Sequence, residues 1–134
     1  MSDIQENFPG IKLDEDLFKY STFQIGGPAD YFYKLKKTEE LQPLINFAKI
    51  NHIDIFIFGG GSNILFDDNG FRGLVIKIET ENIEVDGEYM TADAGIMISK
   101  LIKYSIEHDL VGLEKWVGLP GTVGGAVRGN AGCN

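Results

Sequence analysis

The stretch that decides the fold is Ile53-Asp54-Ile55-Phe56-Ile57-Phe58-Gly59-Gly60-Gly61-Ser62-Asn63, where branched and aromatic residues end abruptly at three glycines. A short apolar run bounded by a turn signal is typical of a buried strand. The glycines that follow can adopt positive φ and let the backbone approach a neighbour closely. We therefore predict a strand over residues 53–58 and a tight loop over residues 59–63.

A strand and a helix are predicted upstream of this stretch. Residues 31–35 are rich in aromatic side chains and predict the strand, while Thr38 is the expected N-cap of the helix. An apolar stripe at helical spacing follows, formed by Leu41, Leu44, Ile45 and Ala48. Pro43 has no backbone donor, so the helix either starts later than Thr38 or bends at the proline. The strand, helix and strand should form a right-handed crossover with parallel strands, and ligands gather at the carboxyl ends of such strands.

The second half of the chain predicts a further strand, a hairpin and a helix. The strand covers residues 74–78, and the hairpin pairs residues 83–85 with residues 89–92 around Asp86-Gly87. Helical spacing then continues through Ile98, Leu101, Ile102 and Ser105. We expect an α+β fold, with a small parallel strand-helix-strand subdomain followed by a mixed or antiparallel sheet subdomain. The expected organisation is a lead-in over residues 1–19 and one domain over 20–134, divided into subdomains 20–72 and 73–134.

Composition excludes several classes of protein. The 134 residues carry a net charge of −8 with a pI near 4.6, so nucleic acids and anionic membranes are disfavoured partners. The single cysteine, Cys133, cannot form a disulfide framework or a cysteine-based metal site within one chain. No stretch approaches the roughly 20 apolar residues that cross a bilayer. These features predict a soluble, cytoplasmic protein without a metal site.

Two glycine clusters suggest a binding site. In residues 59–63, freed main-chain amides are joined by the Ser62 hydroxyl and the Asn63 amide, uncharged donors that suit a diphosphate. For three glycines alone, a plain structural turn is about as good an interpretation. The second cluster, residues 118–126, repeats the pattern with Thr122, and two loops suit a two-ended ligand such as a dinucleotide. Ile64 occupies the third glycine position of a Rossmann fingerprint, and neither loop is followed by the Lys-Ser or Lys-Thr of a P-loop.

The motifs together resemble the UDP-N-acetylenolpyruvoylglucosamine reductase family, in its N-terminal FAD-binding part. They are Tyr20-Ser21-Thr22-Phe23-Gln24-Ile25-Gly26-Gly27-Pro28-Ala29, Gly59-Gly60-Gly61-Ser62-Asn63-Ile64-Leu65, Gly112-Leu113-Glu114, the run from Gly118 to Val127, and Asn130-Ala131-Gly132. The resemblance runs from about residue 20 to the last residue and implies a truncated FAD-binding domain of type 2, the para-cresol methylhydroxylase (PCMH) type.

The resemblance also implies a cofactor and an activity. In the family, NADPH reduces FAD, and the flavin passes hydride to UDP-N-acetylglucosamine enolpyruvate to give UDP-N-acetylmuramate. This NADP-dependent oxidoreductase serves peptidoglycan biosynthesis, and hence cell wall biogenesis, cell shape and cell division. By position, residues 59–63 would embrace the FAD diphosphate and residues 118–126 would lie along the ribityl chain and the ring. The cofactor-binding residues implied are Gly59, Gly60, Gly61, Ser62, Asn63, Ile64, Gly95, Gly118, Leu119, Pro120, Gly121, Thr122, Gly124, Gly125, Ala126 and Asn130.

The family's catalytic arginine, serine and glutamate lie beyond the matched segment, so no residue is assigned a catalytic role. The chain alone is expected to be inactive, and NADPH and the UDP-sugar become partners only if a C-terminal portion supplies the substrate domain. Cys133 and Asn134 replace the alanine and the aromatic residue usual in relatives. Arg128 is interpreted as a phosphate contact, a structural residue or a solvated side chain.

Other side chains have plainer interpretations. Trp116 and the phenylalanines at positions 56, 58 and 66 are expected in the core, and His52 and His108 should cap helix C-termini. Two alternatives stay open. The chain could be the FAD domain of another PCMH-type oxidase or dehydrogenase, or a noncatalytic module that has lost flavin. Apolar surface left exposed by truncation could also drive self-association.

Overall fold

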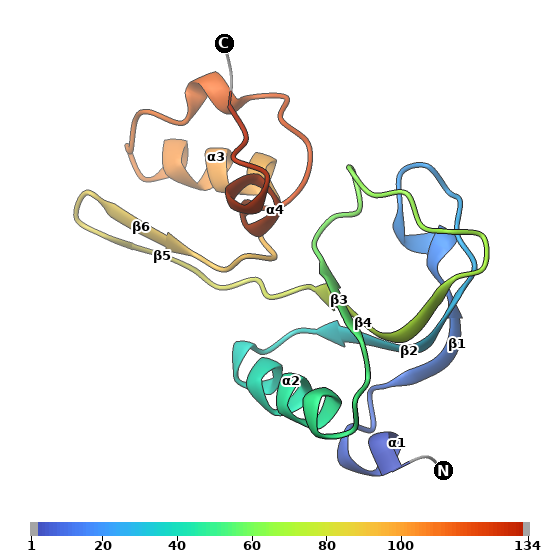
Figure 1. The fold of residues 1–134 in the computed structure, drawn as a ribbon. Coiled ribbons are helices and arrows are strands. Elements are labelled where there is room, and N and C mark those ends of the chain that lie inside the picture. Colours follow the sequence, from blue (N-terminus) through green and yellow to red (C-terminus); the bar gives the residue numbers. More distant parts are fainter. Residues whose placement is uncertain (1–2, 133–134) are drawn as a thin grey trace.

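The structure, a computed structural model, describes residues 3–132. Figure 1 shows two bodies: a sheet with a helix packed on one face, and a smaller body that holds a hairpin and the C-terminal helices. The elements in order are α1 (Asp3–Asn7), β1 (Lys12–Asp16), η1 (Leu17–Tyr20), β2 (Pro28–Leu35), η2 (Thr38–Glu40), α2 (Leu41–Ile50), β3 (Ile55–Phe58), β4 (Phe71–Ile78), β5 (Ile83–Asp86), β6 (Tyr89–Ala92), α3 (Ile98–Glu107), η3 (Glu114–Trp116) and α4 (Val123–Arg128), where η marks a 3-10 helix.

The first body is built on a mixed four-stranded sheet with the strand order β1-β2-β4-β3. Strands β2, β4 and β3 are parallel, which confirms the predicted parallel unit, and β4 lies between the two strands that α2 connects. The predicted boundary between residues 72 and 73 falls inside β4. The first body therefore extends to Ile78, because β4 supplies the centre of the sheet.

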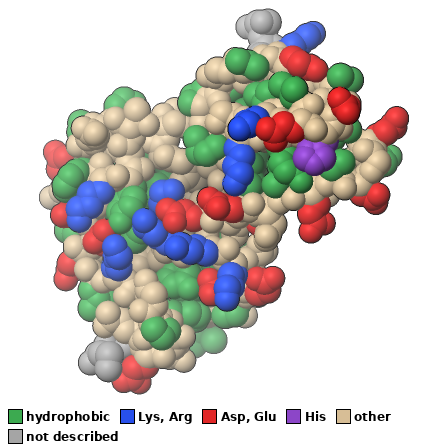
Figure 2. Space-filling view, turned by 180° about the vertical axis from the view of Figure 1, so that it is seen from behind, with side chains coloured by type: hydrophobic (Ala, Val, Ile, Leu, Met, Phe, Trp, Pro, Cys, Tyr) green, Lys and Arg blue, Asp and Glu red, His purple; other side chains and the backbone are tan. Residues whose placement is uncertain are grey.

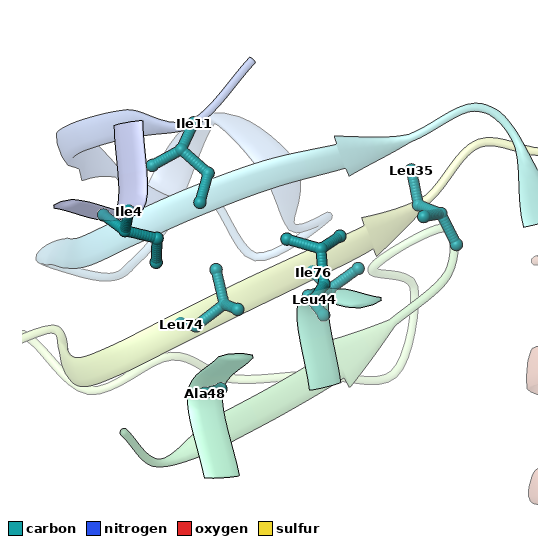
Figure 3. Packing of buried hydrophobic residues seen from close by; sticks show 7 residues of the cluster. All are labelled: Ile4, Ile11, Leu35, Leu44, Ala48, Leu74 and Ile76. Carbon is teal, nitrogen blue, oxygen red and sulfur yellow. The ribbon is translucent and has the colours of Figure 1, made fainter. Parts of the chain in front are cut away.

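Side chains point alternately to the two faces of the sheet along the inner strand β4, and this divides the core into two layers. Leu74 and Ile76 point to one face, where they pack with Leu44 and Ala48 of α2 and with Ile4 and Ile11 from the N-terminal segment (Figure 3). Val75 points to the other face and packs with Phe32, Phe58 and Phe66. The expected core positions of Phe58 and Phe66 are confirmed, and Phe56 packs partly buried against the same cluster.

Helix α2 begins later than its predicted cap. Thr38 opens the short η2, and the α-helix starts at Leu41 after Glu40, which makes no side-chain capping bond. The prediction of Thr38 as the N-cap was wrong, and the alternative of a later start was correct. Pro43 therefore lies in the first turn, where its missing N–H would have had no partner within the helix.

Residues 1–19 are more than the lead-in that the sequence suggested. Strand β1 pairs antiparallel with β2 and makes the first sheet mixed. Glu15 at its end accepts a hydrogen bond of 2.6 Å from the Tyr20 hydroxyl, and Tyr20 stacks on Phe32 with ring centroids 4.4 Å apart. These contacts hold the segment from residue 15 to residue 20 against the sheet.

Charges on this face of the sheet are paired. Lys34 and Lys77 are register partners on β2 and β4, and both contact Glu79, at 3.6 and 3.2 Å. One carboxylate thus relieves the repulsion between two neighbouring ammonium groups. Figure 2 shows the molecule from behind, and on that side basic side chains are interspersed with acidic ones.

The second body contains the predicted antiparallel hairpin, β5 and β6, followed by α3, η3 and α4. The α+β class is confirmed, although the mixed sheet belongs to the first body and the second holds two strands. Helix α3 ends at Glu107, and His108 caps it as expected, with its Nδ1 2.8 Å from the Tyr104 carbonyl oxygen. Neither hydrophobic cluster of the described residues includes a side chain beyond Ile78.

Glu15 should make stability depend on pH. The hydrogen bond from Tyr20, and to a smaller extent Lys12, holds the pKa of Glu15 below its ordinary value of 4.5. A carboxyl whose pKa is lowered by folding stabilises the fold above its unfolded pKa, and this contribution is lost as pH falls through the folded value. Glu15→Gln should lower the free energy of unfolding by about 1 kcal/mol at pH 7, and by less at pH 3.

Urea unfolding at both pH values measures this difference. Glu107→Gln is the control, since Glu107 forms an exposed pair with Lys103 and its loss should change little at either pH. An equal cost of Glu15→Gln at pH 7 and pH 3 would contradict this account.

Candidate functional site

The first glycine loop, residues 59–63, leaves β3 at the carboxyl end of the parallel strands, as the sequence predicted. Gly61 has φ +74°, and a Cβ built there would collide with the Tyr20 carbonyl oxygen. The Thr22 N–H donates to the Gly61 carbonyl at 3.0 Å. Segment 20–22 therefore supports the loop from one side.

The second glycine loop, residues 118–126, supports the first from the other side. A Cβ on Gly59 would collide with Thr122 Oγ1, and one on Gly60 would lie 3.5 Å from Gly121 Cα. A Cβ on Gly121 would lie 3.1 Å from Ser62 Oγ. The sequence suggested that the two loops bind separate parts of a ligand at a distance from each other. In the structure the two loops are in contact.

The two loops differ in what their amides do. Within residues 3–132, the N–H groups of Gly60, Gly61, Ser62 and Asn63 donate to no protein acceptor. Successive free amides that are not blocked by side chains form a concavity suited to an anion. The first loop is therefore the part of the site that fits a diphosphate.

The amides of the second loop are largely used within the protein. Val123 donates to Ile96, Gly124 to Ala94, and Ala126 to Thr122, each to a carbonyl at 2.8–2.9 Å. Gly125 donates to Thr122 Oγ1 at 3.3 Å, so this hydroxyl caps α4. Gly124 is needed for packing, because a Cβ there would lie 2.8 Å from the Ala94 Cβ.

A cavity of about 570 Å³ opens beside the contact between the loops. Its lining includes Gly60, Gly95 and Thr122, three of the residues singled out from the sequence. Two lysines and two glutamates also line it, Lys36, Lys77, Glu79 and Glu81, so the formal side-chain charge of the lining is balanced. An anion held at its edge would depend on the free amides of the first loop.

The other residues expected to bind the cofactor lie in several different places. Ile64 packs partly buried against the cluster of Phe58 and Phe66. Ala126 and Asn130 line a separate apolar cavity of about 370 Å³, together with Trp116, which belongs to neither core cluster. Gly118 has φ +90° with nothing within 4 Å of a built Cβ, and Leu119 and Pro120 lead from it to Gly121. Arg128 is exposed in the last turn of α4.

Sequence reasoning missed the supporting role of segment 20–22. Its motif was noticed, but no pattern within it indicates contact with a loop some 40 residues later in the chain. The positive φ of Gly61 and its closeness to Tyr20 become visible only in three dimensions. Among the described residues, no helix is long and apolar enough to span a bilayer, and no three His, Cys, Asp or Glu side chains are grouped so that they could hold a metal ion.

Together, the fold and the candidate site are those of an α+β nucleotide-binding domain, with the first glycine loop at the carboxyl ends of parallel strands. The family model for the FAD binding domain matches residues 29–134, so the chain belongs to that family, whose cofactor is FAD. The first glycine loop fits such a cofactor, because the N–H groups of residues 60–63 have no acceptor among the described residues and can donate to a diphosphate.

Individual relatives point to one kind of flavoprotein. The chain is 38% identical over 131 residues to the UDP-N-acetylenolpyruvoylglucosamine reductase of Rubrobacter xylanophilus, covering 96% of the chain and 44% of the relative. It is 41% identical over 123 residues to that of Clostridium novyi, covering 91% and 40%. The crystal structure of the Thermus caldophilus reductase superposes with a TM-score of 0.70 at 31% identity, covering 92% and 42%. The chain thus corresponds to the FAD-binding part of these reductases and spans less than half of their length.

Contact between the two loops can be tested with a double-mutant cycle. Gly59→Ala alone should lower the free energy of unfolding by about 1–3 kcal/mol, because its methyl group meets Thr122. In a Thr122→Ala background the same substitution should cost less, by roughly 0.5–3 kcal/mol of coupling. Urea unfolding of the four proteins measures the coupling.

Gly87→Ala is the matched control for this cycle, since Gly87 lies in the hairpin turn with nothing within 4 Å of a built Cβ. Its cost should add to that of Thr122→Ala without coupling. Additivity of Gly59→Ala and Thr122→Ala would show that the loops do not touch in solution.

Proposed function

We propose that the chain is the FAD-binding part of an NADPH-dependent reductase that converts UDP-N-acetylglucosamine enolpyruvate to UDP-N-acetylmuramate in peptidoglycan synthesis. The observation that carries the proposal is the row of free amides at residues 60–63, held between segment 20–22 and Thr122. The relatives named above support the reaction. Roles in cell shape and cell division would follow from this reaction, and a cytoplasmic location is proposed with it.

The proposed arrangement assigns the FAD diphosphate to the first loop. Gly59, Gly60 and Gly61 allow the backbone to approach it, and Ser62 and Asn63 add neutral donors. The ribityl chain and ring would extend into the cavity lined by Gly95 and Thr122. Because the amides of residues 123–126 are engaged elsewhere, the second loop would contribute shape and packing more than hydrogen bonds. The assignment of Ala126 and Asn130 to the flavin rests on the family resemblance.

The chain's own residues would bind and position the flavin, and the flavin would supply the redox chemistry. None of the described residues is assigned a catalytic role. NADPH and the UDP-sugar would engage the protein only together with the remaining portion that the relatives possess. The chain alone is proposed to bind FAD without turnover.

Gly60→Val tests this assignment with little damage to the fold. A Cβ at Gly60 lies at an ordinary van der Waals distance from Gly121, and Gly60 lines the cavity, so a larger side chain there should narrow the space for the ligand. FAD affinity, measured by flavin fluorescence or the visible spectrum of the purified chain, should fall at least about tenfold, or about 1.4 kcal/mol. The melting temperature without FAD should stay close to that of the wild type.

Gly87→Asn, in a turn of the hairpin that tolerates asparagine at positive φ, should bind FAD like the wild type. If Gly60→Val binds FAD as tightly as the wild type, the first loop does not belong to the FAD site. A wild-type chain without flavin absorption after incubation with FAD would instead favour a noncatalytic module.

A further inference from the structure

A buried hydroxyl without a hydrogen-bond partner lies against the first glycine loop. Ser21 is 7% exposed, and its Oγ is the one buried side-chain nitrogen or oxygen atom of the described residues that makes no hydrogen bond. Burying a hydroxyl without a partner destabilises a protein, so such a group calls for a physical explanation. The other buried hydroxyls have partners: Thr80 with Gly95, Ser105 with Ile102, and Thr122 with Gly125.

Ser21 lies close to the free amides of residues 60–63. Its Cα lies 3.2 Å from the Cβ position built on Gly61, and the following residue, Thr22, is hydrogen-bonded to the Gly61 carbonyl. The Ser21 carbonyl accepts from the Gln24 N–H at 3.1 Å, which fixes the backbone on its other side. The serine is thus held on a rigid support directly beside residues 60–63.

We infer that Ser21 is a further residue of the diphosphate site, and that its hydroxyl donates to a phosphate oxygen held by the amides of residues 60–63. Rotation about χ1 moves Oγ between staggered positions without moving the backbone, so the hydroxyl can reorient when an anion binds beside it. A hydroxyl adds a donor without adding charge, as do Ser62 and Asn63. The inference rests on the proposed function, because it requires a diphosphate at the first loop.

This role predicts opposite effects of one substitution on stability and on binding. Ser21→Ala removes a buried hydroxyl that has no partner in the ligand-free protein, so the melting temperature without ligand should stay the same or rise. FAD affinity should fall about tenfold, and so should the affinity for ADP, which carries the diphosphate without the flavin. Isothermal titration calorimetry with each nucleotide, and thermal unfolding without ligand, measure these effects.

Ser105→Ala is the matched control. Ser105 is 3% exposed, lies in α3, and donates to the Ile102 carbonyl at 2.8 Å. Its substitution should lower the melting temperature and leave both affinities unchanged. If Ser21→Ala lowers the melting temperature as Ser105→Ala does, or binds both nucleotides like the wild type, the inference is wrong. Absence of FAD binding by the wild-type chain would overturn the proposed function itself.

Discussion

The contact between two glycine loops is the constraint on which the site depends. Gly59 and Gly60, at the end of β3, lie against Gly121 and Thr122, which precede α4. Any side chain at Gly59 would separate them, and the first body of the molecule would lose a contact with the second. The glycines are therefore required by packing between two distant parts of the chain, in addition to the needs of a ligand.

This contact gives the two loops different tasks. In the second loop, hydrogen bonds to Ile96, Ala94 and Thr122 engage the amides of residues 123–126 within the protein. The first loop is supported by the second loop and by segment 20–22, and the amides of its residues 60–63 stay free. A preorganised row of donors binds an anion without first having to be ordered, which lowers the entropic cost of binding. The net charge of −8 adds to the importance of such local donors, since the overall field repels anions.

Much of the fold could be predicted from local pattern. The strand before Gly59, the helix with Leu44 and Ala48, and the hairpin around Asp86-Gly87 follow from periodicity and turn chemistry, and all were found. Strand β1 was missed, because Lys12–Asp16 is rich in charge and lies at the edge of the sheet, where alternation is weak. The start of α2 was placed too early, since Thr38 opens a 3-10 turn that precedes the helix. The contacts of Gly59 with Thr122 and of Gly61 with Tyr20 could not be predicted from local pattern, because they join residues far apart in sequence. The free amides of the first loop could not be predicted either, because they depend on those contacts.

Hydrogen exchange of the backbone amides, compared with and without FAD, tests the central claim most directly. Amides without a protein acceptor should exchange fast in the free chain, whereas those of residues 123–126 should already be protected by their internal bonds. FAD should slow exchange strongly at residues 60–63 and change the exchange of residues 123–126 little. Protection confined to residues 123–126, with residues 60–63 exchanging as fast as before, would contradict it.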